Sequence, residues 1–306
     1  MKITFWGVRG SIPCPGPKTV KYGGNTPCIE LRFNGLDRLV IIDAGTGIRE
    51  LGNHLMAHKA PDQVINAEIF LTHTHWDHIQ GFPFFAPIYL RETVLKVYGP
   101  VTFEGETLEK VVGGQWVYRY FPVAHWELAS QVQYIDLPEG IFDLGEGIKL
   151  ITKYMNHPLL CLGYRFEFDG KILCTAYDTE PFRNLFLRNP GDPSYDETVA
   201  REAEQAAREA NAGLEDFFSG ADLLIYDAPY TQEEYESAKV GWGHSSMEHA
   251  ISSARRAGVR RLALFHHEPT RTDAQMDALA EKLDSTDSTG DTLEVFFARE
   301  GQCIEI

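Results

Sequence analysis

Short runs of β-branched and aromatic residues recur along the chain and predict a protein built mainly from β-strands. The runs are bounded by glycine, proline and polar residues, which end strands more often than they continue them. No internal repeat or low-complexity segment separates the runs. They span residues 2–8, 28–34, 38–45, 67–73, 95–99, 132–137, 148–155, 223–229, 261–267 and 293–298.

One further segment, YRFEFDGKILCTAYD, predicts a β-hairpin whose turn fixes how its strands pair. Asp169 and Gly170 suit a two-residue type I′ turn, which requires a positive φ at both positions. With this turn, position i lies opposite position 339 − i, so Asp178 lies opposite Cys161. Because Cys161 is only four residues past His157, we expect Asp178 and His157 at the same end of the sheet.

Three segments predict helices, at residues 45–58, at about 197–212 and at about 246–257. The first segment places its apolar residues at i, i+3, i+4, i+7 and i+8, the spacing of one helix face. The last segment begins with Ser245 and Glu248 as a capping box and ends before a glycine. Helices that recur within a mostly strand pattern indicate an α/β fold, with sheets covered by helices.

Two stretches interrupt the pattern and predict insertions. The chain has 306 residues, 43% of them hydrophobic, which suffices for one large domain without disulfide bonds. The glycine- and aromatic-rich sequence GGQWVYRYFPVAHWEL and the sequence FRNLFLRNPGDP are typical of loops or lids. We therefore expect a single domain over residues 1–306, with insertions near 101–130 and 182–220.

The composition indicates a cellular compartment and excludes some classes of binding partner. The five cysteines include no C-x-x-C pair, which favours reduced thiols in a cytoplasmic protein. No apolar run approaches about 18 residues, so the sequence predicts no transmembrane helix and no membrane partner. The formal net charge of −16 disfavours long nucleic acid as a partner, because affinity for phosphates comes largely from lysine and arginine.

Four potential metal ligands fall within six positions of the segment FLTHTHWDHIQGF. The segment follows an apolar strand, and a loop that leaves a strand can turn several side chains toward one point. His73 and His75 are two residues apart and face the same way in an extended backbone, as two ligands of a zinc-like ion would. Asp77 and His78 cannot easily reach the same ion, so we expect them to serve a second one.

Candidate ligands also stand where other predicted strands end. His157 ends the run 148–155, Asp178 ends the hairpin, and a carboxylate there can bridge two cations. The run 261–267 ends in two histidines, His266 or His267, either of which is a further candidate. Asp43 ends a buried strand, where a carboxylate is costly without a partner. We expect the Asp43 carboxylate to accept a hydrogen bond from a ligand histidine, or to cap the N-terminus of the following helix.

The order H-T-H-W-D-H, followed by the later histidines and Asp178, resembles the metallo-β-lactamase superfamily of dinuclear hydrolases over nearly the whole chain. The resemblance implies an α/β fold, a four-layer αβ/βα sandwich of two mixed β-sheets flanked by helices, with the metals at one edge. It implies two divalent ions, with Zn²⁺ expected and Mn²⁺ or iron as alternatives. The implied ligands are His73, His75 and His157 for the first ion, Asp77, His78 and His266 for the second, and Asp178 as the bridge.

The sequence GWGHSSMEHA narrows the branch of the superfamily. His244 precedes a helix N-terminus, where a histidine can hold a phosphate and protonate a leaving oxygen. In ribonuclease Z-like phosphodiesterases a histidine before such a helix is catalytic. The resemblance implies that Asp77 and His244 are catalytic, and that His244 and Ser245 bind the substrate. The segments GVRGSIPCPGPKTVKYGGNTPCIEL and DAGTGIRELG are similar to phosphodiesterases grouped with phosphoribosyl 1,2-cyclic phosphate phosphodiesterase. Similar enzymes are often homodimers.

The resemblance implies hydrolysis of a small phosphodiester, a cyclic nucleotide or cyclic phosphate, by attack of a metal-bridging hydroxide that Asp77 orients. Transfer-RNA-processing ribonuclease Z has an arm between the third histidine and the bridging aspartate, whereas here a hairpin fills that interval. Three alternatives remain at this point: a thioester or lactone hydrolase on the same metals, a ribonuclease acting on RNA 3′ ends, and a non-catalytic binding or sensor module.

Overall fold

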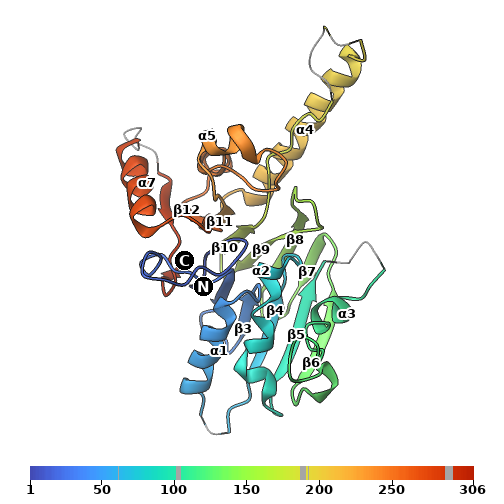
Figure 1. Cartoon of the computed structure of the whole chain (residues 1–306), viewed down its shortest axis with the longest axis vertical. Coiled ribbons are helices and arrows are strands. Elements are labelled where there is room, and N and C mark those ends of the chain that lie inside the picture. The colour runs from blue at the N-terminus through green and yellow to red at the C-terminus, as the bar shows by residue number, and fades with distance from the viewer. Residues whose placement is uncertain (61, 101–104, 187–190, 192, 287–291) are drawn as a thin grey trace.

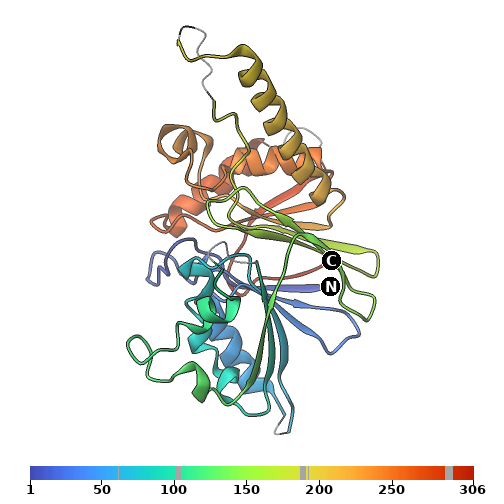
Figure 2. The same ribbon diagram turned by 90° about the vertical axis from the view of Figure 1, so that its right-hand side faces the viewer.

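The computed structural model describes residues 1–60, 62–100, 105–186, 191, 193–286 and 292–306. These residues form two seven-stranded sheets that pack face to face, with helices on the outer face of each sheet (Figure 1). The view in Figure 2 shows the two sheets from the side and the two chain termini close together. The four-layer arrangement agrees with the α/β sandwich expected from the sequence.

The first sheet contains strands from the N-terminal half of the chain and the last strand. Its order is β14 (Cys303–Glu305), β1 (Lys2–Gly7), β2 (Cys28–Arg32), β3 (Leu39–Ile42), β4 (Asn66–Phe70), β5 (Val94–Gly99) and β6 (Gln131–Asp136). Pairing is antiparallel from β14 to β3 and parallel from β3 to β6.

The second sheet repeats this arrangement with the remaining strands. Its order is β7 (Gly140–Asp143), β8 (Lys149–Tyr154), β9 (Leu162–Phe168), β10 (Lys171–Ala176), β11 (Leu223–Asp227), β12 (Arg261–Phe265) and β13 (Glu294–Phe297). Pairing is antiparallel from β7 to β10 and parallel from β10 to β13. Pairing therefore changes from antiparallel to parallel at β3 in one sheet and at β10 in the other.

The helices cover the outer faces and the connections. They are α1 (Gly47–His58), α2 (Trp76–Ile79), α3 (Leu108–Gly113), α4 (Glu197–Phe218), α5 (Gln232–Glu234), α6 (Met247–Arg256) and α7 (Asp273–Thr286). Short 3₁₀ turns η1 (Phe82–Phe84), η2 (Ala86–Tyr89) and η3 (His125–Glu127) and the π-helical turn η4 (Tyr235–Lys239) join them. Helix α4 projects from the body of the molecule in both views (Figures 1 and 2). Within the described residues, none of these helices has the length and apolarity needed to cross a membrane.

Three apolar cores hold the layers together. The central core lies between the sheets and contains large aromatic residues such as Phe5, Phe70 and Phe166. One outer core packs α1 against the first sheet, and the other packs the C-terminal end of α4, with α6, against the second. Burial of this kind contributes about 25 cal/mol per Å² of apolar surface, so the sheets provide a rigid support for the loops at their edge.

The hairpin and most strands form as predicted. Asp169 and Gly170 both have positive φ, and Lys171 pairs with Phe168 in the register that the turn predicts. The sequence reading missed β7, β14 and α7, and it ended α4 six residues early. Helix α3 lies within the stretch expected to be a loop or lid, and residues 101–104, 187–190 and 192 of the two predicted insertions lie outside the described residues.

The predicted cap of α6 was wrong by one position. Ser246, not Ser245, is the N-cap residue, because its hydroxyl accepts a hydrogen bond from the His249 amide at 3.1 Å. With Ser246 as the N-cap, the third residue of the helix is His249, so Glu248 does not form a capping box, and its carboxylate accepts from the Gln232 amide at 2.8 Å. The Ser245 hydroxyl instead donates to the Thr179 carbonyl at 2.6 Å.

Candidate metal centre

The seven predicted ligands converge at one edge of the sandwich, where strands of both sheets end. His73 and His75 follow β4, and Asp77 and His78 lie on the single turn of α2. His157, Asp178 and His266 follow β8, β10 and β12 of the second sheet. Their ligand atoms form two separate groups, each of which could hold a metal ion: His73, His75, His157 and Asp178, and Asp77, His78 and His266. A third possible group, Asp178, Asp227, His244 and His266, shares one residue with each of them.

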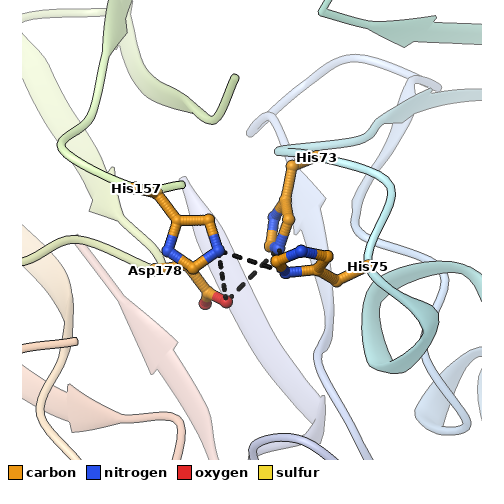
Figure 3. A group of neighbouring side chains, drawn as sticks. All are labelled: His73, His75, His157 and Asp178. Atoms are coloured by element: carbon orange, nitrogen blue, oxygen red, sulfur yellow. Dashed lines mark hydrogen bonds and ion pairs between the residues drawn. The ribbon is translucent and has the colours of Figure 1, made fainter. Parts of the chain in front are cut away.

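Three imidazoles and one carboxylate make up the first group (Figure 3). His75 Nδ1 lies 3.0 Å from His73 Nε2 and 3.1 Å from His157 Nε2. Asp178 Oδ2 lies 3.3 Å from His73 Nε2 and 3.9 Å from His157 Nε2. Figure 3 shows the histidines and the carboxylate directed at one point, and three nitrogen ligands with one oxygen ligand suit a zinc-like ion.

The second group is more deeply buried. Asp77 Oδ2 lies 3.1 Å from His266 Nε2 and 3.4 Å from His78 Nε2. The Ser11 amide donates to the same Asp77 oxygen at 2.7 Å, which fixes this carboxylate from the side of the N-terminal loop. Ser11 has φ +63, an uncommon backbone conformation for a residue other than glycine.

The Asp178 carboxylate lies between the two groups. Its Oδ2 is 3.3 Å from His73 Nε2 and 3.3 Å from His78 Nε2, whereas its Oδ1 is 3.3 Å from His266 Nε2. Both Asp178 and His266 have positive φ, which is a strained conformation for such residues. The surrounding sheets hold this backbone and place the carboxylate between histidines of both groups.

Asp43 lies behind the second group. Its Oδ2 is 2.7 Å from His78 Nδ1, and its Oδ1 accepts from the Thr72 amide at 2.7 Å. A carboxylate in this position fixes the tautomer of His78 and turns Nε2 toward the site. Asp43 does not cap α1, whose N-cap residue is Thr46.

A second carboxylate of this kind, Asp227, was not identified from the sequence. It is fully buried at the end of β11, and its Oδ2 lies 2.9 Å from His244 Nδ1 and accepts from the Thr179 amide at 3.0 Å. Its Oδ1 lies 3.6 Å from His266 Nδ1. The run LLIYDAP ends in an aspartate just as RLVIIDAG does, and that shared pattern was the available signal.

His244 reaches the same site from the loop before α6. It lines a pocket of about 490 Å³ together with Ser11, His75, Trp76, Asp77, Asp178 and His266. The His244 and His266 rings stack with centroids 4.9 Å apart. Ser245, the other residue predicted to bind substrate, is fully buried, and its hydroxyl donates to the Thr179 carbonyl at 2.6 Å.

Of the two adjacent histidines, only His266 belongs to the site. His267 Nε2 lies 2.8 Å from the Ala298 carbonyl, and the ring packs against Phe297 in the interior. Burial lowers the pKa of His267 to about 3, so the ring is neutral. Of the two side chains, that of His266 faces the other candidate ligands, and that of His267 faces the interior.

The pKa shifts of the candidate ligands favour the binding of cations. Burial lowers the pKa values of His73, His75 and His157, which leaves these imidazoles neutral, the form that binds metal. Burial alone would raise the pKa of Asp178, but His266, His78 and His73 outweigh it and hold the pKa well below its usual range. Burial lowers the pKa of His244, but the Asp227 carboxylate outweighs that effect and raises the pKa to about 9.

Two buried polar atoms test whether the group fits a metal. His78 Nε2 and Asp178 Oδ1 are buried and accept or donate no hydrogen bond among the described residues. An unsatisfied buried polar atom costs about 1–3 kcal/mol, so a native protein rarely keeps two in one cluster without a partner. Both atoms face the candidate ligands, and the donor set of imidazoles and carboxylates fits two divalent cations.

Comparisons with known proteins agree with this geometry. A sequence model of the Beta-lactamase superfamily domain matches residues 38–189. Ribonuclease Z of Lactococcus lactis subsp. lactis is 30% identical over 297 residues, which cover 87% of this chain and 88% of that protein. The metallo-beta-lactamase fold protein YhfI of Bacillus subtilis superimposes with a TM-score of 0.64 at 18% identity, covering 100% of this chain and 98% of YhfI. The short form of human tRNase Z gives a TM-score of 0.60 at 20% identity, covering 100% and 99% of the two chains.

Proposed function

The chain belongs to the metallo-β-lactamase superfamily, and we propose that it is a dinuclear phosphodiesterase that hydrolyses a small phosphodiester, a cyclic nucleotide or a cyclic phosphate. One observation supports the phosphodiesterase reading most directly. His244, oriented by Asp227, lines the same pocket as Asp77 and Asp178. A histidine in that place can contact a phosphoryl group held at the metals.

The residues that would hold the ions follow from the two groups. His73, His75 and His157 would hold one ion, and Asp77, His78 and His266 would hold the other. Asp178 could serve both ions, because its Oδ2 lies near His73 and His78 and its Oδ1 lies near His266. When bound, the pair of divalent ions, with Zn²⁺ expected, supplies an activated water and offsets negative charge on the phosphoryl oxygens.

Three side chains of the chain act on the substrate or on one another. Asp77 accepts a hydrogen bond from the attacking water and orients it, since its carboxylate faces the pocket. His244 carries a proton on Nε2 toward the leaving oxygen. Asp227 is a positioning residue: it accepts the Nδ1 proton of His244 at 2.9 Å and leaves Nε2 directed at the pocket.

Metal-dependent hydrolysis of bis-p-nitrophenyl phosphate tests this assignment, with a p-nitrophenyl thioester assayed in parallel. We expect turnover of the phosphodiester and little of the thioester. His244→Ala should lower kcat for the phosphodiester by about 10²–10⁴-fold, because the proton donor is lost, while the metal content stays unchanged. His58→Ala, on the exposed end of α1, is the matched control and should retain full activity. Unchanged turnover in the His244 variant, or faster hydrolysis of the thioester, would contradict the assignment.

A second candidate is hydrolysis of RNA at its 3′ end. Its support is the 30% identity to ribonuclease Z of Lactococcus lactis subsp. lactis over most of both chains. Against it stand the net charge of −16 and the interval between His157 and Asp178, which strands β9 and β10 fill with a hairpin. Assaying a transfer-RNA precursor with a 3′ trailer beside cyclic mononucleotides separates the two candidate functions. Preferential cleavage of the precursor would favour the ribonuclease and contradict the small phosphodiester as substrate.

A further inference from the structure

The loop that carries His244 has little conformational preference of its own. It joins the π-helical turn η4 to α6 and contains Gly241 and Gly243, whose φ angles are +90 and +81. Glycine loses more conformational freedom on folding than any other residue, so other contacts must hold such a loop in one conformation. The position of His244 therefore depends on the groups that bind the backbone of this loop.

One buried carboxylate, that of Glu180, binds the loop backbone at two points. Its Oε1 accepts from the Gly241 amide at 2.7 Å, and its Oε2 accepts from the Gly243 amide at 3.0 Å. Its Oε1 also accepts from the hydroxyl of Tyr235, on η4, at 2.7 Å. Hydrogen bonds to a carboxylate are among the stronger ones in proteins, so Glu180 fixes the loop on both sides of one residue.

The backbone of Glu180 is bound to the segment that carries His157. The Glu180 amide donates to the Asn156 carbonyl at 2.9 Å, and the Asn156 side chain donates to the Glu180 carbonyl at 3.0 Å. Glu180 also follows the candidate bridging ligand Asp178 by two residues. Glu180 therefore connects the segments that follow β8 and β10 with the loop before α6.

Gly243 links Glu180 to the metal centre. The Gly243 carbonyl accepts from His157 Nδ1 at 3.0 Å, and Nε2 of the same ring faces His75. A carbonyl in this position fixes the tautomer and the orientation of a ligand histidine. The two residues are in close contact, since a Cβ on Gly243 would lie 2.5 Å from His157 Nδ1. A shift of Gly243 would therefore move the acceptor of His157 as well as the neighbouring His244.

We propose that Glu180 is a positioning residue that orients a candidate metal ligand, His157, and the proton donor, His244, at the same time. Asp227 contacts His244 directly, whereas Glu180 acts on both histidines through the backbone of Gly243. For His244 the inference rests on the proposed phosphodiesterase function. For His157 it requires only that the site binds metal.

Glu180→Gln disrupts this link with little change in side-chain volume. In either orientation of the new amide group, its N–H groups face the Gly241 or the Gly243 amide, so one of the two contacts with the loop is lost. We expect the ion that His157 would hold to bind about 10–100-fold more weakly, and the other ion to be little affected. Competition with a chromophoric chelator measures both dissociation constants for Zn²⁺ without any substrate.

The kinetics of Glu180→Gln test the effect on His244. At saturating metal, kcat for bis-p-nitrophenyl phosphate should still fall by about 10–100-fold, because a small displacement of a reacting group has effects of this size. Glu180→Asp keeps the charge but is shorter by one methylene group. It should lie between the wild-type and Glu180→Gln proteins in both metal affinity and kcat.

Two further variants control for a merely structural effect. Glu236→Gln removes the same charge from an exposed position on η4, and it should keep the wild-type kcat and both dissociation constants. Tyr235→Phe removes one donor to Glu180 but leaves both glycine amides bound. It should lower the free energy of unfolding in chemical denaturation, and it should change each dissociation constant by less than about threefold.

Wild-type affinity for both ions in Glu180→Gln, or equal weakening of the two ions, would overturn the proposal. A normal kcat at saturating metal would overturn the role of Glu180 toward His244. If Glu180→Gln does not fold, the same measurements on Glu180→Asp decide, and wild-type values there would overturn the proposal. If the metal-loaded wild-type protein does not hydrolyse the diester, the proposed function fails, but the metal titration still decides whether Glu180 orients His157.

Discussion

Asp43 and Asp178 occupy corresponding positions in the two sheets, yet their carboxylates face different partners. Asp43 follows β3 and Asp178 follows β10 by two residues, and at these two strands the pairing changes from antiparallel to parallel. Both residues have positive φ, +60 and +39. Each sheet thus presents a buried aspartate with positive φ just after the strand at which its pairing changes from antiparallel to parallel.

The difference lies in the groups that surround each carboxylate. Asp43 accepts from the Thr72 amide and hydroxyl and faces His78 Nδ1, the back of the imidazole ring. Asp178 faces Nε2 atoms, including that of the same His78, and its Oδ1 has no hydrogen bond among the described residues. His78 is therefore held between the two sheets. The hydrogen-bonding groups around each carboxylate, and not its burial or its position after a strand, distinguish a supporting carboxylate from a candidate bridging ligand.

Asp178→Asn should have the largest effect on this arrangement. The change keeps the volume and tolerates the positive φ, but it removes the negative charge between the two groups. Because the two ions together lower the barrier by several kcal/mol, we expect kcat/KM for bis-p-nitrophenyl phosphate to fall by at least about 10³-fold. Metal analysis of the purified variant should show fewer than two ions per chain. A variant with two ions and normal turnover would show that Asp178 is not the bridge.

Asp43→Asn should have a smaller effect that excess metal reverses. The amide would place an N–H group against either the Thr72 amide or His78 Nδ1, so His78 loses its orientation. Loss of such a supporting carboxylate typically lowers metal affinity or activity by about 10–100-fold. Metal titration of the activity should show a higher concentration at half-saturation and a nearly normal maximum. A low maximum at saturating metal would place Asp43 in the reaction itself.

Tyr164→Phe should have the smallest effect on activity. The Tyr164 hydroxyl, on β9, donates to the Leu71 carbonyl at the end of β4, and so it joins the two sheets without touching either aspartate. We expect the free energy of unfolding to fall by about 0.5–1.5 kcal/mol and kcat/KM to change by less than about threefold. Chemical denaturation and kinetics measure the two. A loss of activity as large as that of Asp43→Asn would mean that the packing of the sheets, rather than the carboxylates, determines the geometry of the site.

Much of the site could be predicted because its ligands stand directly after strands. His73, His75, Asp77 and His78 share one short segment, and a periodicity of two along a strand end is visible in the sequence. The turn at Asp169 and Gly170 also fixes a register by simple counting. Local geometry of this kind does not depend on the rest of the chain.

The remaining features depend on contacts between distant segments. Asp227 is separated from His244 by 17 residues and from His266 by 39, and no local pattern pairs it with either. The position of the α6 cap was missed because Ser245 and Ser246 have the same side chain, and only the Thr179 carbonyl, from another strand end, distinguishes them. The short edge strands β7 and β14 gain their stability from neighbours rather than from their own sequence.

The central claim is that two divalent ions bind together between the sheets and are required for hydrolysis of a phosphodiester. The most direct test prepares the protein with a chelator and titrates it with Zn²⁺ or Mn²⁺. Bound metal and hydrolysis of bis-p-nitrophenyl phosphate are measured at each step. The account predicts that activity rises until two ions are bound per chain and disappears when the chelator is restored. Saturation of activity at one ion per chain, or hydrolysis that persists in the chelated protein, would contradict it.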